Sequence, residues 1–135
     1  MENKKIKWLI YTVLVGLIPV LSRLLIWSVT KTNQITAISA SDFISFGLIL
    51  HISNINEIEH LEATDKSWKT IQNGTSIAFI AMYSVLFALL LFKESNAEMI
   101  DLIAIERSSL GLSIVSFIIS FSVFHRISKL RTTGE

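Results

Sequence analysis

Four charged residues lie within or beside otherwise apolar stretches of this 135-residue chain: Arg23, Asp42, Glu106 and Arg107. Charge inside a bilayer is costly, so such residues usually face a bundle interior or water and pair with one another. A layer of two positive and two negative groups at one depth would suit a sensing or permeation site. The alternative is a structural ion-pair layer near the membrane interface, in which Arg23 snorkels outward and Asp42 caps a helix.

A stripe of serines runs through the last apolar stretch. Ser109, Ser113, Ser116 and Ser120 follow spacings of three and four residues, so they share one helix face with Glu106. Small residues let membrane helices approach closely, and serine hydroxyls can hydrogen-bond across the contact, which predicts a helix-packing role. The alternative is a serine-lined aqueous path formed by several copies, although no ring of like charge accompanies the serines in the apolar part.

The segment 54–69 reads NINEIEHLEATDKSWK and is rich in acidic residues. An acidic segment beside a membrane is repelled by anionic lipid, so a cytoplasmic protein partner is its more natural ligand. The candidate partner-binding residues are Glu57, Glu59, Glu62, Asp65 and Trp68. The alternative is a solvated helix extension followed by a turn.

The remaining reactive side chains form no catalytic or metal-binding pattern. Glu57 and His60 have the spacing of a di-iron ligand pair, but no second such pair follows. The chain has no cysteine, which excludes disulfides, thiolate metal sites and cysteine nucleophiles. It also lacks a nucleophile elbow and a glycine-rich phosphate loop. We therefore expect a protein that is not an enzyme, with no catalytic residues, no metal and no cofactor.

The elements that must position these residues are indicated by long apolar runs. Three of the runs, 11–26, 77–92 and 108–124, are almost free of charge, and a fourth, 35–55, is interrupted by Asp42, His51 and serines. Runs of about 17–25 apolar residues can cross a bilayer as helices, and these runs do not alternate as barrel strands would. With 51% hydrophobic residues and a mean hydropathy of +0.57, the chain is predicted to be an all-α, polytopic membrane protein embedded in the lipid bilayer.

We expect a single domain, 1–135, of four transmembrane helices at about 6–29, 40–63, 70–92 and 96–128. Two capping pairs predict the starts of the second and fourth helices: Ser39 with Asp42, and Ser95 with Glu98. Pro19 should kink the first helix, and Trp8 and Trp27 should anchor its ends at the membrane interfaces.

Lysine and arginine are distributed unevenly around these helices. Eight lie at the chain ends and in the connection between the second and third helices: Lys4, Lys5, Lys7, Lys66, Lys69, Arg126, Lys129 and Arg131. Only Lys31 and Lys93 lie in the other two connections. Positive residues accumulate on the cytoplasmic side, so both termini are predicted to be cytoplasmic. The net charge of +1 offers no basic surface for nucleic acid, and direct nucleic-acid binding is not expected.

The run SASDFISFGLILHISNINEIEH (39–60), after a lysine-led first helix containing GLIP (16–19), resembles the small four-helix membrane subunit of the Kiwa phage-defence system. The resemblance covers the first two helices and the following turn, about half the chain. It implies a homo-oligomer in the bacterial inner membrane that detects infection and partners a DNA-binding cytosolic subunit. It also implies that the surface facing this subunit includes parts of 56–69 and of the tail from His125.

Taken together, these features predict a non-enzymatic inner-membrane sensor or scaffold that forms a homo-oligomer and docks a cytoplasmic partner. One alternative is a small pore- or channel-forming effector whose last helix lines the path. Another is a membrane immunity or accessory protein that binds a second membrane protein laterally.

Overall fold

The computed structural model describes residues 6–31, 36–60, 66–96 and 98–133, and every element in these ranges is helical. The first helix comprises a π-helical segment, η1 (Leu9–Leu14), and α2 (Val15–Val29). It is followed by α3 (Ala40–Glu59), α4 (Lys66–Ser95) and α5 (Leu102–Thr133). The predicted all-α class is therefore confirmed.

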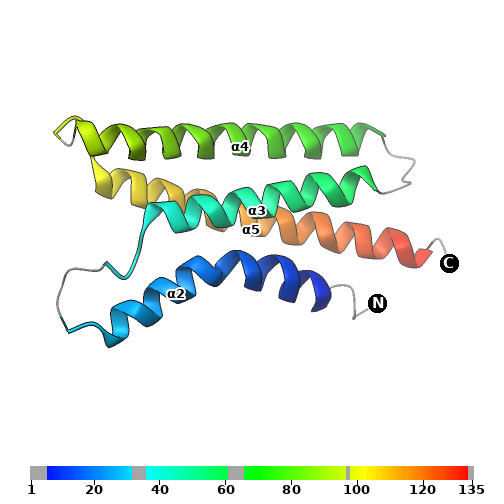
Figure 1. The fold of residues 1–135 in the computed structure, drawn as a ribbon. Coiled ribbons are helices and arrows are strands. Elements are labelled where there is room, and N and C mark those ends of the chain that lie inside the picture. Colours follow the sequence, from blue (N-terminus) through cyan, green and yellow to red (C-terminus); the bar gives the residue numbers. More distant parts are fainter. Residues whose placement is uncertain (1–5, 32–35, 61–65, 97, 134–135) are drawn as a thin grey trace.

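The central helix of this bundle is α3. Figure 1 shows it between α4 and the first helix, with α5 beside it, and α3 contacts each of the other helices. The start of η1 and the end of α5 lie at the same end of the bundle as the end of α3 and the start of α4. This end, which we call the terminal end, therefore carries both ends of the described chain.

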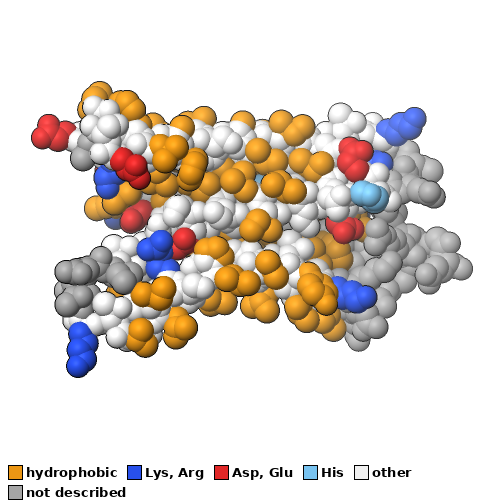
Figure 2. Space-filling model, viewed as in Figure 1, with side chains coloured by type: hydrophobic (Ala, Val, Ile, Leu, Met, Phe, Trp, Pro, Cys, Tyr) orange, Lys and Arg blue, Asp and Glu red, His pale blue; other side chains and the backbone are white. Residues whose placement is uncertain are grey.

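Three helices are long and apolar enough to cross a membrane, namely Ile6–Val29, Lys66–Ser95 and Leu102–Lys129. Their apolar side chains point largely outward: Leu25 is 66% exposed, Ile77 61% and Ile118 59%. Figure 2 shows such side chains along the length of the bundle, with most charged side chains gathered towards its two ends. An apolar surface of this extent needs lipid around it, so the protein has the properties of a membrane protein.

The helix α3 is shorter and more polar than the other three. Its 20 residues include nine that are buried, among them Asp42, His51 and Asn54. These polar residues interrupt the apolar run that the sequence shows, because they face neighbouring helices rather than the surroundings. The helix α3 therefore differs from the three candidate spans in its central position in the bundle and in its buried polar side chains.

Several helix boundaries differ from those predicted. The last helix begins at Leu102, because the Asp101 carboxylate accepts hydrogen bonds from the backbone N–H groups of Ile103 (3.1 Å) and Ala104 (3.3 Å). The predicted cap at Ser95 is wrong, since this hydroxyl donates back to the carbonyl of Phe92 (3.1 Å). Similarly, α3 starts at the expected position, but the Ser39 side chain bonds the Ser41 hydroxyl and caps nothing.

The other ends shift by a few residues. The third helix starts at Lys66 rather than 70 and ends at Ser95, and the fourth extends to Thr133. The second ends at Glu59, and the predicted continuation to 63 falls largely on 61–65, outside the described residues.

Pro19 lies within α2, as expected for a kinked first helix. Proline has no N–H for the preceding turn and its ring crowds the carbonyl four residues earlier, so the helix bends away from it. In Figure 1, α2 curves away from α3 towards Val29. The two helices are close at Gly16, where an added Cβ would meet Phe46 and Ile49, and they are farther apart towards Val29.

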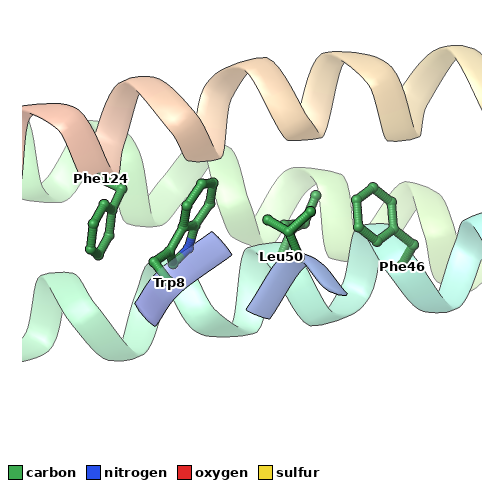
Figure 3. Packing of buried hydrophobic residues seen from close by; sticks show 5 residues of the cluster. Trp8, Phe46, Leu50 and Phe124 are labelled. Carbon is green, nitrogen blue, oxygen red and sulfur yellow. The ribbon is translucent and has the colours of Figure 1, made fainter. Parts of the chain in front are cut away.

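Aromatic packing holds the first helix to the bundle near the terminal end. Trp8 stacks on Phe124 of α5, with 5.1 Å between ring centroids, and this cluster includes Phe46 and Leu50 of α3 (Figure 3). Trp8 is only 6% exposed, so it packs inside the bundle instead of serving as the predicted interfacial anchor. Trp27, at the other end of the helix, is half exposed.

Helices α3 and α4 approach closely at Gly47. A Cβ atom added there would overlap the ring of Tyr83, whose side chain is fully buried. Gly47 is therefore a position where only a hydrogen atom leaves room for the neighbouring helix.

Replacing Gly47 with alanine should destabilise the protein by about 1–3 kcal/mol, because the new methyl group forces Tyr83 to move. The matched control is Gly111→Ala in α5, an exposed position where no side chain or neighbouring helix lies within 4 Å of an added Cβ. This control should be neutral or stabilising, since alanine favours helix by about 0.5–1 kcal/mol over glycine. Thermal unfolding in detergent, followed by circular dichroism, compares the two, and equal melting temperatures would contradict the close approach.

Candidate functional site

A histidine lies at the centre of the bundle with both ring nitrogens hydrogen-bonded. His51 of α3 is fully buried. Its Nδ1 atom lies 3.2 Å from the Ser76 hydroxyl of α4, and its Nε2 atom lies 2.8 Å from the Ser116 hydroxyl of α5. A hydroxyl can either donate or accept, so this pairing satisfies the imidazole in either tautomer. One side chain thereby links three helices.

Two aromatic residues of α4 complete the surroundings of His51. The Tyr83 hydroxyl lies 2.6 Å from the Ser116 hydroxyl, and the ring of Phe79 stacks on the imidazole at 4.8 Å between centroids. Both rings come from the face of α4 that meets α3, at the level where Gly47 gives Tyr83 room. The polar core of the bundle therefore consists of His51, Ser76, Tyr83 and Ser116, covered by Phe79.

A second polar contact follows one turn along α3 and α5. The Asn54 amide donates to the Ser120 hydroxyl at 2.9 Å, and both residues are buried. His51 and Asn54 are one turn apart on α3, and their partners Ser116 and Ser120 are one turn apart on α5, so both pairs form in the same register. These two contacts set the register of α3 against α5.

All four serines of the predicted stripe on α5 are buried within this single chain. Ser116 and Ser120 hydrogen-bond side chains of other helices, as described above. Ser109 and Ser113 instead donate to carbonyls of their own helix, those of Glu106 (3.0 Å) and Leu110 (2.8 Å). The stripe thus combines cross-helix hydrogen bonds with close packing.

The contact between His51 and Ser116 has the distance of a base–nucleophile pair, but its surroundings do not suit catalysis. Both side chains are fully buried, and the Ser116 hydroxyl is shared with Tyr83. A substrate carbonyl has no approach to this oxygen in the structure. Within the described ranges, no three His, Cys, Asp or Glu residues lie close enough together to hold a metal ion.

Of the four charged residues singled out in the sequence, the structure brings two together. The Arg23 Nε atom donates to the Asp42 carboxylate at 2.5 Å, joining α2 to the first turn of α3. Among the described residues, no ion pair connects Glu106 or Arg107 of α5 to this pair. Glu106 is partly buried and Arg107 is exposed. The contact that Asp42 makes is thus the ion pair with Arg23. The side-chain cap predicted at Ser39 is absent.

The acidic residues near the end of α3 lie at the terminal end of the bundle. Glu57 is partly buried and Glu59 is exposed, with the Asn73 amide donating to Glu59 at 3.1 Å. Glu62 and Asp65 fall outside the described residues. His60, which the sequence pairs with Glu57, lies 2.8 Å through Nδ1 from the carbonyl of Asn56. The described part of the acidic segment therefore presents Glu59 and His60 outward.

Trp68, the aromatic residue among the candidate partner-binding residues, packs against other parts of the same chain. It packs against a buried cluster formed by Ile58, Val123 and Ile127. The guanidinium of Arg126 lies 4.5 Å from the centre of its ring, in a cation–π contact. Trp68 and Arg126 therefore form one surface that joins the start of α4 to the end of α5.

Sequence reasoning missed the polar core around His51, including Tyr83. A signal was available, because His51 and Asn54 lie on one face of α3 and the serines lie on one face of α5. Periodicity identifies such faces without showing which helix each one meets.

Comparison with protein families, with characterised proteins and with solved structures finds no match to this chain.

The polar core predicts that His51→Leu destabilises the protein, because the Ser76 hydroxyl and one side of the Ser116 hydroxyl lose a buried partner. The expected loss is about 1–3 kcal/mol. His60→Leu is the matched control, since this exposed histidine bonds only its own helix. Melting temperatures in detergent report the difference.

The same core predicts coupling between His51 and Ser116. In the double variant His51→Leu/Ser116→Ala, the loss of stability should be smaller than the sum of the two single losses. Strict additivity would show that the two side chains do not share a hydrogen bond in the membrane protein.

Proposed function

We propose that this protein is a non-enzymatic scaffold or sensor of the bacterial inner membrane that forms a homo-oligomer and docks a cytoplasmic protein. The observation that carries the proposal is the arrangement of an apolar exterior around a buried polar core, with charged groups gathered at the two ends. The resemblance of 39–60 to the Kiwa membrane subunit adds phage defence as the setting of this role.

The proposed topology has four crossings and cytoplasmic termini. At 1.5 Å per residue, the 20 residues of α3 extend about 30 Å, which matches the thickness of the hydrocarbon core. Three polar side chains of α3, those of Asp42, His51 and Asn54, are buried in the bundle, so they do not prevent the helix from lying in the membrane. The terminal end holds more of the lysines and arginines, and the positive-inside tendency supports its placement in the cytoplasm.

Self-association is supported by an outward face of α4. Gly74, Ala81, Ser84 and Ala88 are exposed, and an added Cβ at Gly74 would meet no atom. Faces of small residues allow the backbones of two membrane helices to approach closely. A second copy could therefore pack here without displacing any contact within the chain.

Docking of a soluble protein is supported by the position of the acidic residues. Glu57 and Glu59 lie at the terminal end, which the proposed topology places beside the negatively charged inner leaflet. Lipid does not attract such a surface, whereas a basic protein surface would. The pore alternative is less well supported, because the serines that would line a path between copies are buried within the single chain, and Ser116 and Ser120 are hydrogen-bonded to other helices.

Cysteine labelling tests the topology, since the natural chain has no cysteine. Asn96 and Ser67 are exposed at opposite ends of the bundle. In intact spheroplasts, a membrane-impermeant maleimide should modify Asn96→Cys and leave Ser67→Cys unmodified until the membrane is opened. The reverse pattern would refute cytoplasmic termini, and modification of both before lysis would refute a membrane-crossing bundle.

Charge reversal tests the docking surface. Glu57→Lys combined with Glu59→Lys should abolish pull-down of the proposed cytoplasmic partner from cell lysate, while the oligomer size in detergent stays unchanged. Because exposed charges are screened over about 10 Å at 0.1 M salt, wild-type binding should also weaken as salt rises.

The matched control for this experiment is Glu94→Lys with Glu98→Lys, the same change of charge on exposed residues at the opposite end. This control should bind the partner normally. Equal loss in both variants would indicate a general effect of charge, and normal binding by the Glu57/Glu59 variant would place the docking surface elsewhere.

A further inference from the structure

The bundle has a cavity where α2 separates from α3. It has a volume of about 350 Å3, opens to the surface, and is lined by Pro19, Ser22, Arg23, Ile26 and Asp42. Its place follows from the course of α2, which contains Pro19 and curves away from α3 towards Val29 (Figure 1). Basic and acidic side chains lie side by side between these two helices at this end of the bundle (Figure 2). We call this space the α2–α3 cavity.

The α2–α3 cavity offers unused hydrogen-bonding groups. Among the described residues, the Arg23 guanidinium makes one hydrogen bond, through Nε to Asp42. A guanidinium has five N–H donors, so its two terminal nitrogens remain available. The Arg23 side chain is 32% exposed, and the hydroxyl of the exposed Ser22 bonds no other described residue. A ligand can therefore reach donors that the ion pair leaves free.

The charges of the cavity select the kind of ligand. Arg23 and Asp42 neutralise each other, so a purely anionic or cationic group gains on one side and is repelled on the other. A group that carries both a phosphate and an ammonium matches both: guanidinium nitrogens bind phosphate oxygens, and a carboxylate accepts hydrogen bonds from an ammonium. Pro19 and Ile26 add an apolar part to the lining. This combination fits the polar head and the first carbons of a phospholipid.

The depth of the cavity also matches a lipid head. Trp27 lies one turn beyond Arg23 on α2 and is half exposed, and tryptophan is enriched at the level of lipid headgroups. The long side chain of Arg23 can extend toward that level while its Cα atom stays deeper. A phospholipid of the surrounding leaflet therefore needs no passage through the protein to reach the cavity.

We infer that the α2–α3 cavity binds the headgroup of a phospholipid with a primary amine, of the phosphatidylethanolamine class. The Arg23 terminal nitrogens and the Ser22 hydroxyl hold its phosphate, and Asp42 accepts its ammonium group. This inference rests on the membrane-spanning helices and does not depend on a cytoplasmic partner.

Competition between lipids, measured by native mass spectrometry of the detergent-purified protein, tests this inference. The lipids are phosphatidylethanolamine, phosphatidylglycerol and phosphatidylcholine with identical acyl chains. Phosphatidylethanolamine should bind about tenfold more tightly than the other two, since phosphatidylglycerol lacks the ammonium and the methylated amine of phosphatidylcholine has no N–H to donate. Equal binding of the three lipids would overturn the inference.

Three variants separate the site from general effects. Ser22→Leu fills the cavity without touching the ion pair and should remove the preference, whereas Ser45→Leu, at an exposed position of α3 outside the lining, should retain it. Asp42→Asn should shift the preference to phosphatidylglycerol, because Arg23 then carries an unbalanced charge. An unchanged preference in Ser22→Leu would overturn the site, even if Asp42→Asn fails to fold.

Soluble probes distinguish a lipid from a free phosphate compound. Inorganic phosphate and phosphoethanolamine, added to the same complexes at concentrations up to about a hundredfold above the lipid, should not displace phosphatidylethanolamine, because they lack the acyl chains that hold it at the helix surface. Displacement by either compound would assign the cavity to a free phosphate ligand and overturn the lipid assignment.

Discussion

The arrangement of the helices depends on satisfying both ring nitrogens of His51 in a place that water does not reach. Ser76 and Ser116 supply the two partners from α4 and α5, and Tyr83 shares the second hydroxyl. A slip of one helix along another would leave at least one of these groups buried without a partner, at a cost of about 1–3 kcal/mol. The contact between Asn54 and Ser120 applies the same constraint one turn away. Together they favour a single register for α3, α4 and α5.

The protein also shows how a bundle is held together when its exterior must remain apolar. Burial of apolar side chains separates helices from water but gives little preference for another helix over lipid. Close contacts and polar pairs must therefore supply specificity. Gly47 admits Tyr83, Gly16 faces the ring of Phe46, and Arg23 joins Asp42. The aromatic cluster around Trp8 adds shape-specific packing near the terminal end.

Much of the helical framework is predictable from the sequence, because lipid requires long apolar segments wherever a helix faces it. The charges of Arg23 and Asp42 are likewise conspicuous, and their cost in a membrane explains why they meet. Helix ends are less predictable: Ser95 and Asp101 both fit a cap, and only the folded chain shows that Asp101 takes the free N–H groups. The partners of His51 and the burial of Trp8 could not be predicted, because periodicity defines faces but not which faces meet.

The order of the helices along the chain also affects how the protein is made. In the proposed topology, α3 leaves the ribosome before the residues that satisfy it, and His51 precedes Ser116 by 65 positions. At a synthesis rate of about 5–20 residues per second, this gap corresponds to roughly 3–13 seconds. During that time α3 carries His51 and Asn54 without their partners from α5. Its stable insertion is therefore a late event, completed when α5 emerges and closes around it.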